Sequence, residues 1–216
     1  MNTDMLEIRQ LPRLTPAHIQ SLPRLEGEED PLRTDGLLAL AGLLDIIIDV
    51  RRAEILLLLD NRSTDNFYIG NACLLVGRGF SNLNYPYPHH RNGPLGERVD
   101  FHHTAKTREG ILFKATMEIL DHWEFSFLAT ELVFFVTEIP GLIDPLPSYG
   151  CPGDDVSESF IEDNNPKWTS KVKILGVSAM QAKNHHDSES EISHPLEMEP
   201  IGKKRSKLYE IFKPKE

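Results

Sequence analysis

The chain has 216 residues, 40% of them hydrophobic, and a formal net charge of −10. This length fits one domain with tails, and the hydrophobic content is enough for a packed core, which excludes a fully disordered protein. The acidic balance excludes a general attraction to nucleic acid or anionic lipid, so we expect no sequence-specific nucleic-acid binding. Two cysteines, Cys73 and Cys151, are too few for a disulfide framework and are typical of a reducing compartment such as the cytoplasm.

No secretory signal and no membrane span is expected. Residues 1–30 carry Asp4, Glu7 and three prolines without an apolar block. Residues 37–60 are the most apolar run, but five charged residues lie between Asp45 and Glu54. Each of these would cost about 2.5–3.5 kcal/mol at the centre of a bilayer, which excludes this run as a span.

Residues 1–35 are expected to form an N-terminal arm and linker. Thr15 can cap a helix and Pro16 suits its first position, while Pro23 ends it near Leu22. The acidic, Gly- and Pro-containing stretch that follows favours a linker. The apolar residues that could pack this arm on a neighbouring surface, and that we select as self-association residues, are Leu14, Ile19 and Leu22.

The core is expected at residues 36–180. Leucines in residues 37–44 suggest a buried helical turn or two, and the β-branched residues 46–50 predict a strand. Residues 53–60 favour a helix, because their apolar side chains fall largely on one side. For residues 68–76 the periodicity leaves helix and strand open.

The second half of the core reads as β structure. Residues 77–96, rich in Gly, Pro and Asn, favour a long surface loop or a pair of turns. Beyond them, apolar and polar residues alternate over 99–103 and 111–119, with Glu109 and Gly110 in the hairpin turn between the two strands. Residues 128–139 are apolar on both faces and predict a central strand.

The last strand is expected at Val172 and Ile174, with Val177 out of phase beyond Gly176. Residues 181–216 are polar and acidic and then basic, which predicts a disordered tail. The fold class is therefore predicted as α+β: a single core with a mainly antiparallel sheet packed against one or two helices, and a flexible arm and tail.

Histidines are the candidates for metal chemistry. Neighbouring residues on a strand point to opposite faces, so the pairs at 89–90 and 102–103 could each offer one ligand. His90, His103 and Glu109 are the selected ligands, since histidine with carboxylate suits zinc or iron in a cupin-like enzyme. No tight spacing such as HExxH occurs. The favoured interpretation is therefore no catalytic residue, no metal and no cofactor.

The end of the tail is basic. Its four cations, Lys203, Lys204, Arg205 and Lys207, have the form of a short nuclear-import signal or a small anion-binding patch. The alternative is a solubilising charge run that balances the acidic stretch before it. A protein whose tail binds a partner, an interaction adaptor, is a further hypothesis.

The order of features in residues 45–123 resembles the core of the rhabdovirus matrix proteins. In that family an apolar strand leads into a helix, an aspartate–aromatic–glycine turn, a variable loop and a strand pair. The corresponding strand, helix, turn and strand pair here are residues 46–50, 53–60, 65–70, 97–102 and 110–119. The acidic arm without a PPxY motif departs from the animal-virus members and suits a plant-infecting member that assembles at the nucleus.

This resemblance implies a non-enzymatic viral structural protein. Such a protein would self-associate as a homo-oligomer, bind the viral nucleoprotein complex and link it to the envelope at the membrane periphery. Its expected locations are the virion and the host cell, including the nucleus, where the basic end of the tail would act.

Overall fold

The computed structural model describes residues 5–62, 64, 66–85, 97–117, 123–142 and 164–182; for residues 97–103, 117 and 123 it describes the backbone alone. The chain divides into two units, Met1–Lys183 and Asn184–Glu216, and only the first contains described residues. The predicted disorder of the tail and the import-like cations of residues 203–207 lie outside the described residues.

Within these residues the fold is mainly antiparallel β structure with short helices. The helical segments are the 3-10 helices η1 (Ile8–Arg13) and η2 (Gly27–Glu29) and the α-helix α1 (Pro16–Ser21). The strands are β1 (Leu6–Glu7), β2 (Ala41–Asp49), β3 (Glu54–Asp60), β4 (Ala72–Arg78), β5 (Ser81–Asn84), β6 (Glu97–Lys106), β7 (Ile111–Met117), β8 (Trp123–Ala129), β9 (Glu131–Glu138) and β10 (Lys171–Gln181).

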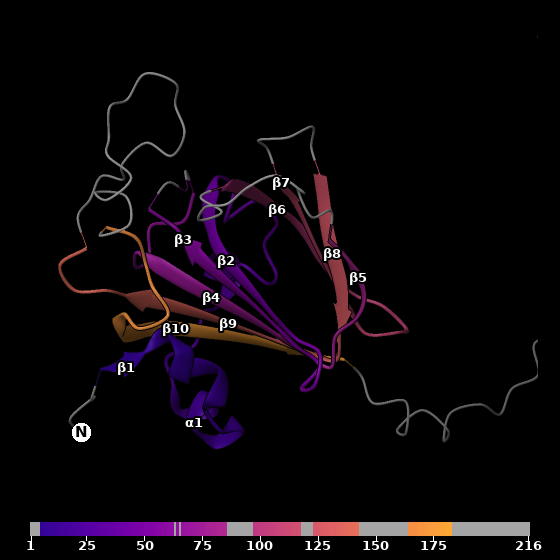
Figure 1. Ribbon diagram of the computed structural model, residues 1–216, viewed down its shortest axis with the longest axis horizontal. Coiled ribbons are helices and arrows are strands. Elements are labelled where there is room, and N and C mark those ends of the chain that lie inside the picture. Colours follow the sequence, from indigo (N-terminus) through magenta and orange to yellow (C-terminus); the bar gives the residue numbers. More distant parts are fainter. Residues whose placement is uncertain are drawn as a thin grey trace, which may run out of the picture. The chain divides into compact units, whose positions relative to one another are not determined.

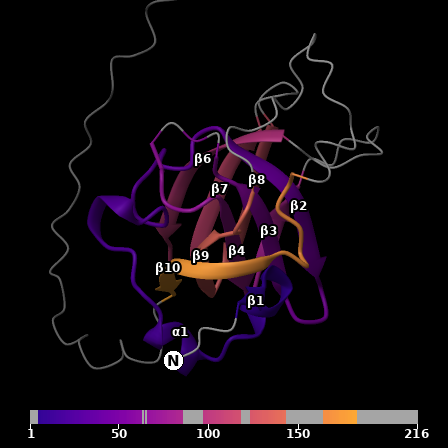
Figure 2. The same cartoon turned by 90° about the vertical axis from the view of Figure 1, so that its left-hand side faces the viewer.

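These strands are hydrogen-bonded in the order β1-β10-β9-β4-β3-β2-β6-β7-β8-β5. The sheet curves into a half-barrel, so that β6, β7 and β8 rise away from β3, β4, β9 and β10 (Figure 1). Figure 2 looks at the left-hand side of Figure 1, with β10 in front and β9 and β4 behind it. We call β10, β9, β4 and β3 the covered half and β6, β7, β8 and β5 the open half.

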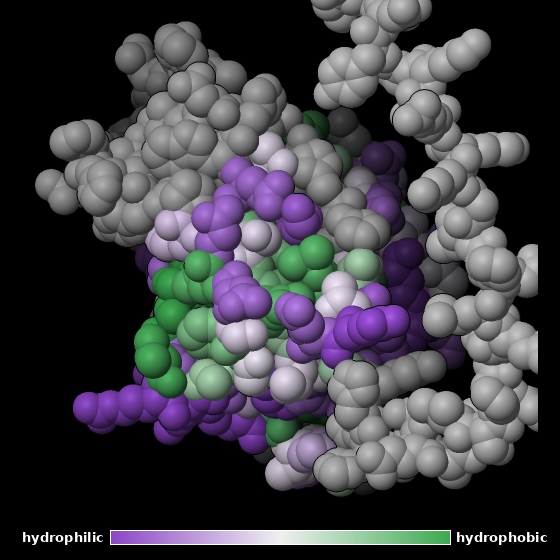
Figure 3. Space-filling model, turned by 90° about the vertical axis from the view of Figure 1, so that its right-hand side faces the viewer, coloured by the Kyte–Doolittle hydropathy of each residue, from purple (hydrophilic) through white to green (hydrophobic). Residues whose placement is uncertain are grey.

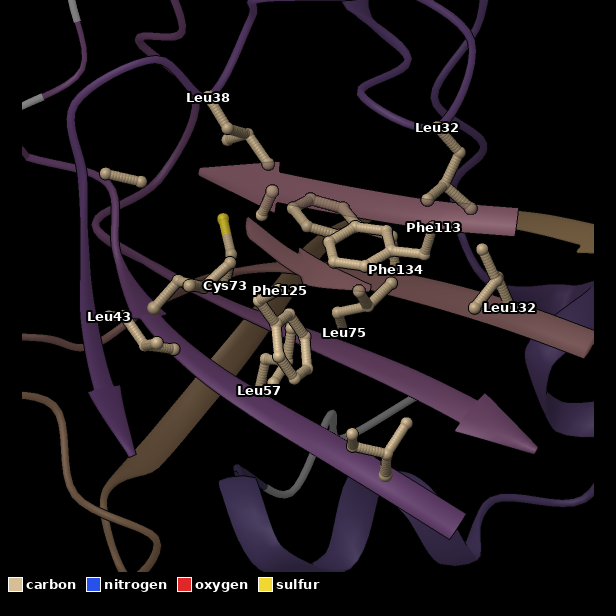
Figure 4. Packing of buried hydrophobic residues seen from close by; sticks show 14 of the residues in the cluster. Leu32, Leu38, Leu43, Leu57, Cys73, Leu75, Phe113, Phe125, Leu132 and Phe134 are labelled. Atoms are coloured by element: carbon tan, nitrogen blue, oxygen red, sulfur yellow. The ribbon is translucent and has the colours of Figure 1, made fainter. Parts of the chain in front are cut away.

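The concave side of the half-barrel holds the main core. Residues of both halves meet there, and two leucines of the turns before β2, Leu32 and Leu38, close it (Figure 4). The rings of Phe113 and Phe125 lie edge to face, with centroids 6.2 Å apart. The other labelled members of this cluster are Leu43, Leu57, Cys73, Leu75, Leu132 and Phe134.

The convex side of the covered half is also buried, because the N-terminal arm lies on it (Figure 1). Ile8, Leu11 and Ile19 of the arm are buried against side chains of β3, β4, β9 and β10. The sheet residues of this second cluster include Leu56, Leu58, Leu74, Val76, Val133, Phe135, Val172 and Val177. The covered half therefore has apolar contacts on both faces.

This double burial overturns two sequence expectations. Residues 53–60, predicted as a helix, form strand β3, and every residue of β3 is buried. Consecutive leucines face opposite sides: Leu57 joins the concave core and Leu58 the convex one. The helical turns predicted for residues 37–44 are also wrong, since the chain forms non-helical turns up to Leu40 and strand β2 from Ala41.

Other expectations are confirmed. Thr15 caps α1, its Oγ1 accepting the amide of His18 at 3.3 Å, and the helix ends before Leu22. The predicted hairpin joins β6 to β7 around Gly110. The out-of-phase Val177 corresponds to a bulge in β10 between Ile174 and Gly176.

Two segments are divided differently from their prediction. Residues 128–139 belong to two strands, because Thr130 separates β8 in the open half from β9 in the covered half. The amide and Oγ1 of Thr130 both donate to the carbonyl of Arg78, at 2.9 and 3.0 Å, which fixes this crossing. In the predicted loop 77–96, Gly77 and Arg78 end β4 and residues 81–84 form β5. The undecided residues 68–76 enter strand β4 at Ala72.

Candidate interaction surface

The far end of β2 exposes two large apolar side chains. β2 pairs with β3 up to Asp49 but with β6 over Ala41–Leu43 only. Beyond Leu43, β3 is its single neighbour among the described strands. Ile47 is 39% exposed and Val50, in the turn that follows, is 78% exposed. Large apolar side chains at a strand edge are a typical protein contact surface.

Local contacts hold this end of β2 in place. A bulge interrupts the β2–β3 register between Leu43 and Asp45. Asp45 Oδ1 accepts the amide of Ile46 at 2.7 Å, and Asp45 Oδ2 accepts the indole Nε1 of Trp168 at 2.7 Å. The edge therefore rests on both its neighbour strand and the segment before β10, which makes it a preformed surface.

The same end carries charges of both signs. Asp49 Oδ1 accepts the amide of Arg52 at 3.1 Å, and their side chains approach to 3.8 Å. Arg51 is exposed and forms no ion pair with the described residues. Acidic and basic groups thus flank the exposed apolar side chains.

Three charged side chains of the covered half pair with one another. Glu54, Arg78 and Glu131 are successive cross-strand partners on β3, β4 and β9. Arg78 Nη1 lies 2.6 Å from Glu131 Oε2, and Arg78 Nε lies 3.8 Å from Glu54 Oε1. The arm joins this row, because Arg13 Nη1 lies 2.8 Å from Glu54 Oε2 and Arg78 Nη2 donates to the carbonyl of Pro12 at 3.0 Å. This row fastens the arm to the sheet.

The cysteine of β4 is a core residue. Cys73 is 1% exposed, and burial, with a smaller contribution from the Asp60 carboxylate, raises the pKa of its thiol well above the ordinary value. A thiol that stays protonated is a poor nucleophile. Asp60 itself is paired with the buried guanidinium of Arg62.

The predicted self-association residues pack within the molecule. Ile19 is buried on the convex face, and Leu14 and Leu22 are partly buried beside it. Their role between copies stays a prediction, and removing the whole arm would expose the convex face that it covers. A truncation therefore would not separate self-association from loss of folding.

The predicted metal ligands are not brought together by the described residues. His90 lies outside them, as do the histidines at 89 and 122. His103 lies on β6 beside a bulge, with its backbone alone described, and Glu109 is exposed in the β6–β7 turn. Among the described side chains no three metal-binding groups gather. The metal site stays a prediction.

The open half offers a second, more mixed surface. Figure 3 shows hydrophobic and hydrophilic side chains side by side on the face of the molecule that carries β5 and β8 in Figure 1. A hollow of about 440 Å³ lies there, lined by Leu112 and Leu128 with polar residues of the β6–β7 turn. Lys114 and Glu124 form an exposed ion pair at 3.0 Å on neighbouring strands. Hydrophobic side chains gather over much of this described face, with hydrophilic ones among them and at its margin.

Comparisons of the chain with protein-family models, with curated proteins and with solved structures find no match. In the described part of the chain, none of the helices has the length and apolar character needed to cross a membrane. The exposed end of β2 was not selected from sequence, because its isoleucines look like core residues. The bulge and the early end of the β6 pairing, which leave Ile47 exposed, have no local sequence signal.

Proposed function

We propose that this chain is a non-enzymatic structural protein that self-associates, with the matrix-like role that its sequence pattern suggested. In that role its copies form an assembly that links a viral ribonucleoprotein to the envelope. The helix of the matrix-like pattern is strand β3 here, so the proposal depends on a surface rather than on that pattern. The observation that carries it is the exposed apolar end of β2.

A second copy is the partner that this surface fits. A strand edge can accept an antiparallel strand through main-chain hydrogen bonds, and a two-fold arrangement lets the same edge serve both copies. The mixed charges suit such pairing, because an antiparallel neighbour brings the exposed Arg51 of one copy towards the acidic Asp45 and Asp49 of the other. Ile47 and Val50 would then be removed from water.

Net charge acts in the opposite direction. Each copy carries a formal charge of −10, which repels other copies at long range. Added salt screens this repulsion and leaves the apolar contact in place. Self-association should therefore strengthen as salt rises to physiological strength.

The test is sedimentation equilibrium of the full chain over a wide concentration range. The double substitution Ile47→Lys and Val50→Lys should weaken self-association by more than about tenfold, because it places two charges in the apolar centre of the contact. Thr116→Lys, an outward-facing position on β7, is the matched control and should leave self-association unchanged.

Two results would contradict the proposal. One is a strict monomer at every concentration and salt level. The other is equal weakening by the Thr116→Lys control, which would mean that the loss of association does not depend on the β2 end. Circular dichroism of each variant checks that the sheet is retained.

A further inference from the structure

The main-chain groups of β2 alternate between bonding to β3 and facing away from it, and contacts in the next strands fix which residues do which. The carbonyl of Arg78 accepts the amide of Thr130 at 2.9 Å, so the main chain of Arg78 faces β9. Glu54, its cross-strand partner on β3, therefore faces β2 and bonds to Asp49, the residue opposite. Ile48, the neighbour of Asp49, then points its N–H and C=O away from β3.

A second contact gives the same assignment. The carbonyl of Ala53 accepts the amide of Phe80 at 3.1 Å, so Ala53 faces β4 and the next residue, Glu54, faces β2. Ile46, two positions before Ile48, faces away from β3 as Ile48 does. The β6 pairing ends before these two isoleucines, so their main-chain groups lie at an open edge of the described sheet.

Two groups at this edge are already bonded within the chain. The amide of Ile46 donates to Asp45 Oδ1 at 2.7 Å. The carbonyl of Val50 accepts the amide of Ala53 at 3.3 Å. An added strand can therefore bond to the carbonyl of Ile46, to both groups of Ile48 and to the amide of Val50, for which the described residues provide no partner.

The available groups match those of a second copy in one antiparallel register. With Ile48 opposite Ile48 of the other copy, the two residues exchange both main-chain bonds, and each Val50 amide meets the Ile46 carbonyl of the other copy. The pair left over in this register is the Ile46 amide with the Val50 carbonyl, which are the two groups already bonded within each chain. Centring the pairing on residue 47 or 49 would instead place a group of Ile48 against an occupied one.

The side chains agree with this register. Ile46 and Ile48 pack towards the concave core, so on that face Ile48 meets Ile48, and Ile46 meets Val50 of the other copy. Val50 is 78% exposed in the single chain, and this contact covers it. On the convex face, Arg51 lies opposite Asp45 of the other copy.

Asp45 is held in position to accept such a cation. Its Oδ1 accepts the amide of Ile46 and its Oδ2 accepts the indole Nε1 of Trp168, both at 2.7 Å. Each carboxylate oxygen can accept a further hydrogen bond. Neither Asp45 nor the exposed Arg51 forms an ion pair with the described residues, so both charges are available to a second copy.

We propose that β2 pairs with β2 of a second copy in the register centred on Ile48, and that the contact between Arg51 and Asp45 selects this partner and this register. The inference rests on the proposed self-association and adds the strand, the register and the selecting charges. A foreign strand with no cation at the position of Arg51 would leave Asp45 without its partner. Because both copies use the same edge, the contact closes on a dimer.

Disulfide trapping in the full chain tests the register. The background carries Cys151→Ser, and the remaining Cys73 is buried. Ile48→Cys should give a disulfide-linked dimer, because the Cα atoms of a hydrogen-bonded antiparallel pair lie about 5.5 Å apart, within the span of a disulfide. Glu109→Cys, an exposed position in the β6–β7 turn, is the control and should stay unlinked.

A mixture of two variants gives a second measure of the register. Ile47→Cys and Asp49→Cys lie directly opposite each other in the Ile48 register, so the mixed chains should link to each other. Each variant alone should link poorly, because its own counterpart is then a diagonal neighbour about 7–8 Å away. Circular dichroism checks that each variant keeps the sheet.

Sedimentation equilibrium tests the selecting charge. Arg51→Glu should weaken self-association by about tenfold, because it turns both attractions with Asp45 into repulsions. Arg108→Glu, at an exposed position in the β6–β7 turn, changes the net charge by the same amount and should weaken self-association far less. Asp45 is not a suitable target, since it holds the amide of Ile46 and the indole of Trp168.

The register is overturned if Ile48→Cys and the mixture both stay unlinked while the chain still associates through the Ile47 and Val50 surface. It is also overturned if Ile47→Cys links to itself as readily as the mixture links. The selecting role is overturned if Arg108→Glu weakens association as much as Arg51→Glu. These results leave the proposed self-association in place, whereas a strict monomer overturns it together with the register.

Discussion

Strands β3 and β7 are both seven residues long and lie in the same curved sheet, but their sequences follow different patterns. In β3 all seven residues are buried, from Glu54 to Asp60. In β7 the buried Ile111, Phe113 and Ala115 alternate with the half-exposed residues between them. The difference is what covers the convex face: the N-terminal arm lies over the covered half, while the described convex face of β7 is partly exposed to solvent. The sequence pattern of a strand therefore depends on whether one or both of its faces are buried, as well as on the strands with which it pairs.

The largest expected effect on the free energy of unfolding comes from weakening the contact between the arm and the covered half. Leu11→Ala should lower the free energy of unfolding by about 2–5 kcal/mol, because Leu11 is fully buried between the arm and the sheet and its loss leaves a cavity. The same change on the convex face of the open half, Leu112→Ala, should cost less than about 1 kcal/mol, since Leu112 is only half-buried. Urea denaturation of both variants measures the difference. Equal losses would contradict the distinction between the two halves.

A smaller effect is expected where the two halves meet across the concave core. A Cβ added at Gly77 of β4 would lie 2.6 Å from the ring of Phe127 on β8 and 2.7 Å from Ile55 on β3. Gly77→Ala should therefore overpack the core and lower the free energy of unfolding by about 1–3 kcal/mol. Thermal or urea denaturation is the measurement. A variant as stable as the unsubstituted chain would show that the halves can move apart at this point.

The smallest effect concerns pH and the buried thiol of the covered half. The folded state raises the pKa of Cys73, mainly through burial and also through the Asp60 carboxylate. Below the ordinary thiol pKa, near 8.5, both states keep the proton and the stability from this group is constant. Above it the unfolded thiol ionises first, so stability should fall by up to about 1.4 kcal/mol per pH unit until the folded thiol also ionises.

The measurement is urea denaturation of the unsubstituted chain and of Cys73→Ala at a series of alkaline pH values. The difference between their free energies of unfolding isolates the thiol, because the other titrating groups are common to both. A difference that does not change with pH would show that the thiol is accessible to water in the folded state.

The secondary structure was predicted correctly where one face of the sheet is exposed to solvent. The alternation in residues 99–103 and 111–119 predicted β6, β7 and their hairpin, and over residues 111–116 the structure shows buried residues alternating with half-exposed ones. The alternation at Val172 and Ile174 likewise predicted β10, and the bulge beside Gly176 explains why Val177 is out of phase. The capping residue Thr15 also placed α1 correctly, because the cap and the helix that it starts lie within a few residues of each other.

The same reasoning failed where both faces are covered. The run of leucines in β3 carries no alternation, so its helical and strand interpretations cannot be separated by periodicity. The strand forms because its second face is buried by the arm, including Leu11, which lies more than forty positions earlier in the chain. The cavity between the β3–β4 loop and β9 was likewise beyond reach, because it brings Asn61 together with Glu138, and no spacing rule connects them.

The pairing of β1 with β10 has a consequence for how the chain is made. Leu6 lies opposite Val172, so the edge strand β1 meets its only neighbour in the described sheet after more than 160 further residues have been synthesised. A nascent chain still on the ribosome can form the β6–β7–β8 meander, but it lacks the strand against which residues 6–7 and the carbonyl of Pro23 are fixed. Closure of the covered half is therefore a step that follows translation of β10, and contacts so distant in sequence should make it slow.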